Sequence, residues 1–304
     1  MSRRGWLLFI AMSVIWGTPY LLIRVAVREL SPATLVFART LPAAVLLVPL
    51  AWRRGQLRPL AARWRWVIAF TAAEIALPWL FLSRAEEHLT SSVAGLLIAT
   101  VPLIAVVLYR WVSPDTERLT RRRLLGLFVG FAGVAALVGI DLHGTDLGAV
   151  AEVAVPAVGY SLGPLIISRR LSHLPSLGVV SASVALTAIA YAPAALIQRP
   201  SRISFEVLAA VAGLAFLCTA LAFLLFFALI AEIGPARSTV ITYVNPAVAV
   251  MLGVVLLGEH FTAGIAVGFP LILVGSFLAT SSPRGAPNPS HSSGTSPDAR
   301  PRSR

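Results

Sequence analysis

Two ionisable residues, Arg39 and Glu74, stand inside long apolar runs of this 304-residue sequence. An ionisable side chain at the centre of a membrane helix costs about 2.5–3.5 kcal/mol on insertion scales, so each one is a candidate for function. Arg39 lies seven residues into its run and Glu74 eight. Antiparallel helices would place both near the middle of a bilayer, where the two side chains can form an ion pair.

Two interpretations of this pair remain open. In the first, a static interior ion pair fixes how two helices pack. In the second, Arg39 binds a carboxylate or phosphate of a substrate, while Glu74 binds an amine or carries a coupling proton. The charge state of Glu74 stays open, because burial and a nearby arginine act on a carboxyl group in opposite directions. If Glu74 carries the proton, we expect Glu74→Gln to abolish pH-dependent transport and leave the protein folded.

Four prolines lie inside apolar runs and pair along the chain, Pro19 with Pro164 and Pro102 with Pro246. A proline inside a helix leaves one backbone carbonyl without its donor, and a bilayer tolerates this only where protein or a water-filled cavity satisfies it. Helix interruptions at matching places in two halves point to the substrate site of a transporter. We therefore expect a pathway lined by the polar and aromatic residues near these breaks: Trp16, Thr18, Tyr20, Thr100, Tyr160, Ser161, Tyr243 and Asn245.

Each of these residues also has a structural interpretation. Tyrosine and tryptophan form belts at membrane surfaces, and small residues pack helices together. For any single residue the structural role is favoured, whereas the set as a whole favours a lining. Trp79 and Phe81 are further candidates to stack on an aromatic substrate, although a position facing lipid is favoured for them.

The composition requires a membrane protein. Hydrophobic residues make up 57% of the chain, charged residues 12%, and the mean hydropathy is +0.83, whereas soluble domains carry about 25% charged residues. A membrane helix needs about 20 apolar residues. Ten runs meet that length: Trp6–Val25, Pro32–Trp52, Trp66–Ser83, Ser91–Val112, Leu124–Ile140, Leu147–Ile167, Leu177–Ile197, Val207–Leu229, Ser238–Leu257 and Gly264–Thr280.

A short segment in the middle of the chain recurs near its end. Glu117 and Thr120 are followed by two glycines, and Glu259 and Thr262 are followed by two glycines at the same spacing. We expect both glutamates to be structural residues at helix entries, each close to a threonine that caps the following span. Two copies of five spans must lie in opposite orientations, and such inverted repeats are typical of secondary transporters.

The predicted fold is therefore an all-α polytopic membrane protein with ten transmembrane helices in two inverted five-helix repeats. The repeats cover residues 1–140 and 147–280, and residues 281–304 form a disordered cytoplasmic tail. Small-xxx-small motifs start at Gly126 and Gly264. They predict close packing within one chain, with a homodimer face as the minority alternative.

The arginines predict the orientation of the chain. The formal net charge is +12, and all 25 basic residues are arginine. With the N-terminus inside, nineteen arginines fall on the inner side, five fall on the outer side, and Arg39 lies within a span. Because positive loops are retained in the cytoplasm, we expect a multi-pass protein of the cell (inner) membrane with both termini cytoplasmic. Topology therefore explains the net charge, and no nucleic-acid partner is expected.

The motifs of the second half point to a known family. Ile233-Gly234-Pro235-Ala236-Arg237-Ser238 follows the eighth span, and Asn245-Pro246-Ala247-Val248-Ala249 lies in the ninth. Leu257-Gly258-Glu259 with Thr262, Gly268 and Gly275 completes the pattern, and the first half repeats it more loosely. With these residues the chain resembles an EamA-type permease of the drug/metabolite transporter superfamily. The resemblance implies ten helices in two inverted five-helix repeats and transport of small organic metabolites, often export, usually without ATP.

We therefore expect a secondary transporter, a permease or exporter, that moves small polar or amphipathic metabolites such as amino acids by alternating access. A proton is a candidate coupling ion, and both a monomer and a homodimer remain open. A carrier of phosphorylated or nucleotide-sugar-like anions is a weaker alternative, because Arg39 is the only basic residue deep in the spans. A non-transporting structural membrane subunit is the rival from another class.

No enzyme, cofactor or metal site is expected. Cys218 is the only cysteine, and all five histidines fall in loops or in the tail. The two halves differ most clearly at Glu74, whose counterpart in the second half is Cys218. We expect substrate specificity to depend on this difference.

Overall fold

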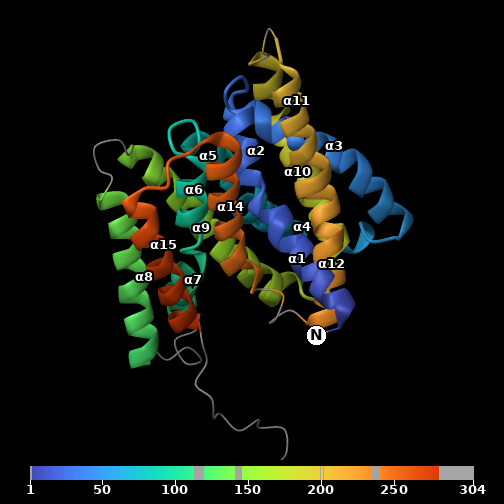
Figure 1. Ribbon diagram of the computed structural model, residues 1–304. Coiled ribbons are helices and arrows are strands. Elements are labelled where there is room, and N and C mark those ends of the chain that lie inside the picture. Colours follow the sequence, from blue (N-terminus) through green and yellow to red (C-terminus); the bar gives the residue numbers. More distant parts are fainter. Residues whose placement is uncertain are drawn as a thin grey trace, which may run out of the picture.

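The computed structural model describes residues 2–112, 120–140, 146–198, 200, 202–234, 238 and 240–280. All regular elements of these residues are helical (Figure 1). Nine of their helical spans are long and apolar enough to cross a membrane, and α14 is a shorter apolar helix. The all-α polytopic fold is therefore confirmed, while the predicted tail, 281–304, lies outside the described residues.

We number the spans one to ten in chain order, and several contain more than one helical element. The bounds are α1 (Arg3–Gly17) and α2 (Pro19–Ala26) in span one; α3 (Pro32–Arg53) in span two; η1 (Arg58–Arg63), α4 (Trp64–Phe70), η2 (Thr71–Ala76) and α5 (Leu77–Ala85) in span three; α6 (Ser91–Ile98) and α7 (Val101–Val112) in span four; α8 (Arg121–Gly139) in span five; α9 (Leu147–Ile166) and η3 (Ile167–Leu171) in span six; α10 (Ser176–Ile197) in span seven; α11 (Phe205–Ala212), η4 (Gly213–Leu221) and α12 (Ala222–Ile233) in span eight; α14 (Ile241–Leu257) in span nine; and α15 (Ala263–Thr280) in span ten.

Polar residues at the span entrances explain where these helices begin. A hydroxyl oxygen that accepts from a backbone N–H in the first turn satisfies one of the unpaired donors of a helix N-terminus. Such caps start spans two, four, five and eight, where the acceptors are Ser31, Thr90, Thr120 and Ser204. At the other end of span nine, Gly258 stops α14 in the left-handed conformation, with φ of 66°, which glycine adopts at little cost.

Contacts between the two halves come in matched sets. Span five packs along span ten, span two along span seven, and span four along span nine. The contact of span one with span nine is matched by that of span six with span four, and the contact of span three with span six by that of span eight with span one. An approximate two-fold axis between the halves produces this pattern. Together with the odd number of spans in each half, it confirms the two inverted five-helix repeats.

Glycines allow the closest of these contacts, between α8 and α15, which lie side by side in Figure 1. A Cβ at Gly126 would overlap the backbone of Gly275 and Ala279, and a Cβ at Gly133 would overlap that of Ile272. The glycines of the small-xxx-small motif beginning at Gly126 therefore contact the same chain, as in other closely packed membrane helices.

The prolines differ between the halves. The helix is interrupted before Pro19, where α1 ends and α2 begins, and between α6 and α7, just before Pro102. In contrast, α9 continues past Pro164 and α14 continues past Pro246. The expectation of four matching interruptions is corrected by this finding, because a helix can absorb a missing N–H where its neighbours support it. Interruptions therefore occur at the two first-half prolines.

Spans three and eight share a feature that the sequence does not show. Each contains a π-helical segment, η2 in span three and η4 in span eight. These segments occupy matching places in the two repeats, and they hold Glu74 and Cys218 respectively. π-Helical turns are rare and often occur at functional sites, so both segments are candidates to position chemistry.

Candidate functional site

Arg39 is the buried cation of the membrane spans. Its side chain belongs to α3 and is 4% exposed. The guanidinium carbon lies 3.6 Å from the centre of the Trp79 ring of α5, and Nη2 donates to Thr219 Oγ1 of η4 at 3.3 Å. Nε has no hydrogen-bond partner among the described residues. The contacts with Trp79 and Thr219 do not use Nε, so this donor stays unsatisfied among the described residues.

The π-helical segment η4 holds Thr219 in place. The Thr219 hydroxyl donates to the carbonyl of Leu214, five residues earlier, at 2.8 Å. A π-helix has hydrogen bonds of this spacing between backbone groups. Because the hydroxyl proton is used on the backbone, a lone pair of the same oxygen faces Arg39. The wider turn therefore supplies an acceptor for the guanidinium from the second half of the chain.

Glu74 does not pair with Arg39. The ion pairs of the described residues are Arg4 with Glu232 and Arg84 with Glu152. The Glu74 carboxylate instead packs against Gly163 of α9, where a Cβ would overlap it, and its Oε2 is buried without a hydrogen-bond partner among the described residues. The Arg39–Glu74 ion pair considered from the sequence is corrected, because the guanidinium contacts Trp79 and Thr219 while the Glu74 carboxyl group packs against Gly163 of another span.

Glycines of α9 create the space for Glu74. A Cβ on Gly159 would overlap the carbonyl oxygen of Ala73, and a Cβ on Gly163 would overlap the Glu74 carboxylate. Without these side chains, span three can approach α9 closely enough to bury a carboxyl group at the contact. Tyr160 lies between the two glycines and interacts electrostatically with both Glu74 and Arg39. Tyr160 is therefore near both ionisable residues, which remain unpaired with each other.

Trp79 does not face lipid, and the expectation favoured from the sequence is corrected. Its side chain is 7% exposed and packs in a core cluster with Ile75, Ala220 and Tyr160. The ring covers the guanidinium of Arg39, and a desolvated cation–π contact of this kind is worth about 2 kcal/mol. Phe81, two residues on, is half-buried and lies 5.5 Å from the guanidinium of Arg84.

The other predicted lining residues fall into separate groups. Trp16 packs on Phe226 at a ring distance of 4.6 Å. With its amide oriented to donate, Asn245 reaches the carbonyl oxygen of Ser13 at 3.2 Å. Tyr243 bonds to the Thr280 hydroxyl at 2.6 Å. These contacts join spans one, eight, nine and ten on the side of the bundle that holds the chain N-terminus.

Thr18, Thr100 and Ser161 bond to backbone carbonyls. The Thr18 hydroxyl donates to Val14 at 2.8 Å, and the Thr100 hydroxyl donates to Leu97 at 2.6 Å. Tyr20 is buried within a cluster of apolar side chains. A pathway role for these residues stays a prediction.

Two hydroxyls brace the chain at the Pro102 break. The Ser161 hydroxyl of α9 donates to the carbonyl of Val101 at 3.0 Å, and the Ser276 hydroxyl of α15 donates to the carbonyl of Ala99 at 3.1 Å. Both serines are 1% exposed or less. Carbonyls beside a helix break need donors inside a membrane. These bonds supply such donors and link span four to spans six and ten.

Glu259 contacts the other half of the chain. Its carboxylate accepts from the backbone N–H groups of Ser91 at 2.7 Å and Ser92 at 3.0 Å, at the N-terminus of α6. Thr262, by contrast, caps its own helix by accepting from the N–H of Ile265 at 3.2 Å. The sequence predicts that Glu259 acts at the entry of span ten, and this expectation is corrected. Glu259 caps span four instead, and the helix dipole favours its negative charge there. Glu117 lies outside the described residues.

Glu259 lies at the end of the bundle opposite the chain N-terminus, and we call this end the distal end. It contains the turns after α2, α5, α10 and α14, and α2, α5, α6 and α11 reach it at the top of Figure 1. A second bond there joins the turn after α2 to span eight, because Glu29 accepts from the N–H of Ser204 at 2.8 Å. This bond lowers the pKa of Glu29.

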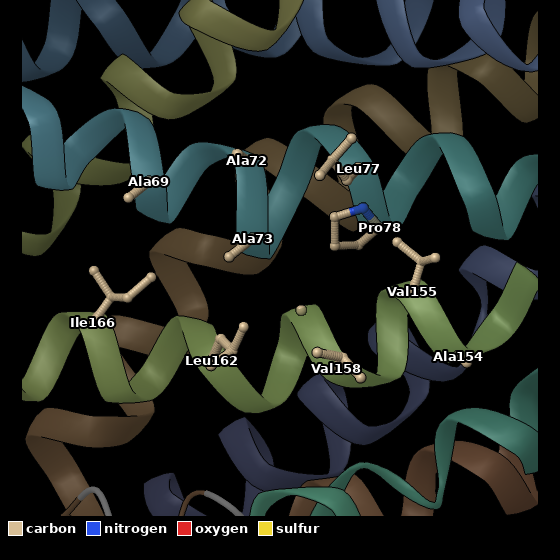
Figure 2. A pocket seen from close by; sticks show the side chains of 11 residues that line it. Ala69, Ala72, Ala73, Leu77, Pro78, Ala154, Val155, Val158, Leu162 and Ile166 are labelled. Carbon is tan, nitrogen blue, oxygen red and sulfur yellow. The ribbon is translucent and has the colours of Figure 1, made fainter. Parts of the chain in front are cut away.

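A cavity of about 550 Å³ lies between span three and α9 (Figure 2). Its walls are small apolar side chains such as Ala69, Ala72 and Ala73 on one side, and Val158, Gly159 and Leu162 on the other. Such a lining suits hydrocarbon and offers no partner to a polar metabolite. The cavity is therefore no candidate for the substrate site, and Arg39 with its neighbours remains the better one.

Two segments of the chain, residues 3–139 and 149–281, each match the model of the EamA-like transporter family. The chain belongs to that family. The two matches follow the two repeats of the structure. EamA-like proteins are transporters, so the buried ionisable residues described above lie within a multi-pass membrane transporter.

Similar proteins cover nearly the whole chain. The Escherichia coli K12 protein named "Uncharacterized inner membrane transporter YedA" is 29% identical over 300 residues, covering 91% of this chain and 93% of its own. The "Probable amino-acid metabolite efflux pump" of Salmonella typhimurium is 24% identical over 292 residues, covering 91% and 95%. The "Probable terminal-alkyne amino-acid exporter" of Streptantibioticus cattleyicolor is 25% identical over 280 residues, covering 91% of each chain.

A solved crystal structure also resembles this EamA-like chain. It aligns with a TM-score of 0.65 and 22% sequence identity, covering 92% of this chain and 97% of the other. At that identity the likeness supports the fold alone.

Sequence reasoning missed two buried polar residues of this EamA-like chain, Thr219 at the site and Glu86 at the distal end. Thr219 follows Cys218, the counterpart of Glu74, so the repeat alignment contained a signal that could have found it. Glu86 follows the third apolar run and precedes Glu87, so the sequence alone predicts an exposed loop residue. It is fully buried in the structure, and no spacing in the sequence indicates this.

Proposed function

We propose that this protein exports small zwitterionic or amphipathic metabolites, amino acids in particular, across the inner membrane. The observation that carries the proposal is the buried, incompletely paired guanidinium of Arg39 at the contact of the two halves. A guanidinium binds a carboxylate through two parallel hydrogen bonds. Arg39 is therefore the residue that binds the substrate carboxylate.

Glu74 supplies the opposite pole. Its Oε2 is buried and lacks a partner among the described residues, and a substrate ammonium group would provide one. Tyr160 interacts electrostatically with both poles, and Trp79 forms an aromatic wall beside Arg39. A zwitterion placed between Arg39 and Glu74 satisfies both ionisable side chains, whereas a simple anion or a simple amine satisfies only one.

The names of two relatives support this substrate class. One is a probable amino-acid metabolite efflux pump, and the other is a probable terminal-alkyne amino-acid exporter. Both cover more than nine tenths of this chain. Amino acids and their analogues are therefore the first compounds to examine.

The transport mechanism is alternating access. The inverted halves rock about the site between them, as in other inverted-repeat transporters, and an ion gradient supplies the energy. The arginine distribution supports a cytoplasmic position for both termini. The distal end, which holds Glu259 and Ser91, then faces the outside.

A ligand screen followed by a flux measurement tests the proposal. Purified protein is screened by thermal shift against the standard amino acids and representative amines and carboxylic acids. The compounds that bind are then followed in proteoliposomes with and without a pH gradient. We expect binding and flux of at least one amino acid. Failure of every compound to bind or to move would support a structural membrane subunit instead.

A further inference from the structure

Glu86 is a fully buried carboxyl group outside the membrane spans. It follows the last residue of α5, and its N–H donates to the carbonyl of Leu82. Its side chain is 0% exposed, and neither carboxyl oxygen has a hydrogen-bond partner among the described residues. A buried carboxylate in this situation is strongly destabilising, while a neutral carboxyl group is much less so. The position therefore favours a bound proton.

Charged and titratable groups surround Glu86 on several elements. Arg24 of α2 donates Nη1 to the backbone carbonyls of Glu86 and Glu87, and so leaves the carboxyl group unpaired. The remaining groups that interact with the carboxyl group electrostatically are Arg39 of α3, Tyr20 of α2, Tyr160 of α9 and Glu259 after α14.

The balance of these groups favours the protonated form. Burial is the main cause that raises the pKa of Glu86 well above its ordinary range, and the nearby Glu259 carboxylate raises it further. Arg24 and Arg39 act in the opposite direction without reversing the shift. Water entering at the distal end would remove the main cause and lower this pKa.

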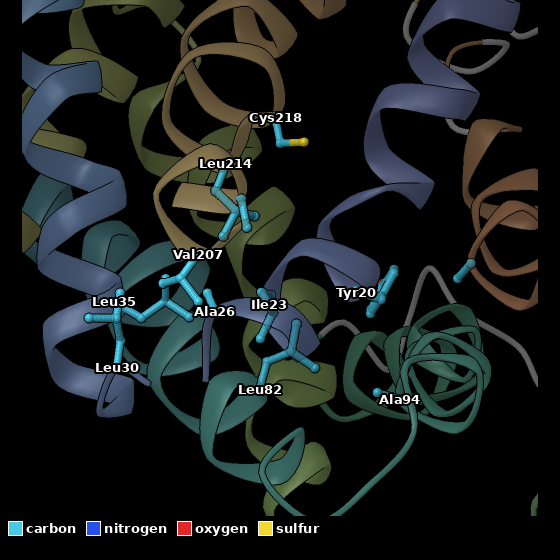
Figure 3. Close-up of a cluster of buried hydrophobic side chains, with 12 residues drawn as sticks. Tyr20, Ile23, Ala26, Leu30, Leu35, Leu82, Ala94, Val207, Leu214 and Cys218 are labelled. Atoms are coloured by element: carbon cyan, nitrogen blue, oxygen red, sulfur yellow. The ribbon is translucent and has the colours of Figure 1, made fainter. Parts of the chain in front are cut away.

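Glu86 lies at a closed end of the bundle. A cluster of buried apolar residues fills this end, and we call it the distal seal (Figure 3). It includes Tyr20, Ile23, Leu82, Ala94, Leu214 and Cys218. Just before Ala94 of the seal, Glu259 joins span nine to the N-terminus of α6 through Ser91 and Ser92. Opening this end for transport requires the seal to separate, which would admit water to Glu86.

We propose that Glu86 is a proton-binding site whose proton holds the distal seal closed and whose deprotonation opens that end of the transporter. The inference rests on the alternating access of the proposed function. The step breaks the O–H bond of the Glu86 carboxyl group and transfers its proton to water entering from the distal side. Because the pKa is raised in the closed form, closure is favoured at low pH and is lost as the pH rises through that value.

The only cysteine of the chain provides the probe for this step. Cys218 belongs to the distal seal and is 3% exposed. A membrane-impermeant maleimide, added on the distal side of sealed vesicles that contain the full chain, labels it when the seal opens. Wild type is compared with Glu86→Gln, which mimics the protonated group. Glu87→Gln is the matched control, because Glu87 is the exposed neighbour.

Dividing the wild-type labelling rate by that of Glu86→Gln at the same pH removes the intrinsic pH dependence of thiol reactivity. We expect this ratio to rise with pH, by up to about tenfold per pH unit for a one-proton equilibrium. The Glu87→Gln control should follow wild type. A ratio that stays constant between about pH 5.5 and about pH 8 would overturn the proposal.

A second measurement covers the case in which Glu86→Gln does not fold. The labelling rate of wild type is then compared with that of a small unstructured cysteine peptide over the same pH range. A rise in excess of the peptide supports the proposal, and parallel profiles overturn it. The labelling needs no substrate, so absence of flux together with a pH-dependent ratio would contradict the proposed function and leave the proton site intact.

Discussion

The π-helical segments η2 and η4 occupy the same place in the two repeats and carry different chemistry. In the first half, η2 presents Glu74, whose carboxylate packs against Gly163 of α9. In the second half, η4 presents Cys218 and Thr219, and the Thr219 hydroxyl accepts from Arg39. The segments thus share a backbone form, but one carries a carboxyl group and the other accepts a hydrogen bond from a cation.

This difference shows what the repeat does and does not determine. The duplicated spans supply the matched contacts between halves and the widened turns of spans three and eight. In the proposed function, residues that differ between the copies give the site two unlike poles. A zwitterion is asymmetric, so a binding site built on a symmetric scaffold needs such a difference to orient it.

Removing the cation of this pair should have the largest effect. Arg39→Met keeps much of the side-chain length and eliminates the charge, so the substrate carboxylate loses its partner. Loss of a buried hydrogen-bonded charge costs about 2–5 kcal/mol, and we expect proteoliposome flux to fall by roughly 30-fold or more. Arg65→Met is the matched control, since Arg65 lies over the exposed ring of Trp64. Normal flux in Arg39→Met would contradict the role of the guanidinium.

Neutral substitutions in η2 and η4 compare the contributions of the two segments to flux directly. We expect Glu74→Gln to lower flux of a zwitterion by about tenfold, because a hydrogen bond to a charged group is worth about 1.5–3 kcal/mol. Cys218→Ala should change flux by less than about twofold, because only a small thiol is removed. Equal effects would show that the difference between the segments is unrelated to transport.

The Glu74→Gln variant also shows whether Glu86 or Glu74 carries the proton. If Glu86 is the proton-binding site, Glu74→Gln keeps the pH dependence of Cys218 labelling. Loss of that dependence in Glu74→Gln would instead make Glu74 the proton carrier.

A smaller effect is expected at the link between halves on the distal end. Glu259→Gln keeps an acceptor oxygen but removes the charge that caps α6 through Ser91 and Ser92. The loss of about 1 kcal/mol should raise distal-side labelling of Cys218 roughly fivefold. Thr262→Ala removes a cap within α15 alone and should leave labelling unchanged. Equal labelling in both variants would exclude Glu259 as a link that restrains opening.

The smallest effect concerns the Pro102 break, a feature of the first half that α14 lacks at Pro246. Ser161→Ala removes the donor to the carbonyl of Val101, and we expect it to lower the free energy of unfolding by about 1 kcal/mol. Ser168→Ala is the matched control in the same span, because Ser168 is exposed and should change that free energy by less than about 0.5 kcal/mol. Denaturant titration in detergent measures both.

Much of the fold follows from the sequence, because hydrocarbon imposes simple rules on helix length and composition. The ten predicted runs match the helical spans to within a few residues at most ends. Span three begins earlier than predicted, since the short helix η1 and α4 extend it to Arg58. The rarity of ionisable residues inside spans directed attention to Arg39 and Glu74, and the repeat singled out Glu74, whose counterpart is Cys218.

The partners of these residues could not be predicted, because they depend on packing between distant spans. Arg39 meets Trp79 and Thr219 in place of Glu74, and Glu259 caps a helix in the other repeat. Pro164 and Pro246 remain inside helices, because local sequence does not reveal whether neighbouring spans support a missing N–H.

The account is tested most directly by flux of three matched compounds. These are the best-bound amino acid of the panel, its decarboxylated amine and its deaminated acid, each measured in wild type, Arg39→Met and Glu74→Gln. We predict that wild type prefers the amino acid over both analogues by about tenfold or more. Arg39→Met should lose discrimination against the amine, and Glu74→Gln should lose discrimination against the acid. Equal transport of all three compounds by wild type, or identical preferences in the two variants, would contradict a zwitterion site between Arg39 and Glu74.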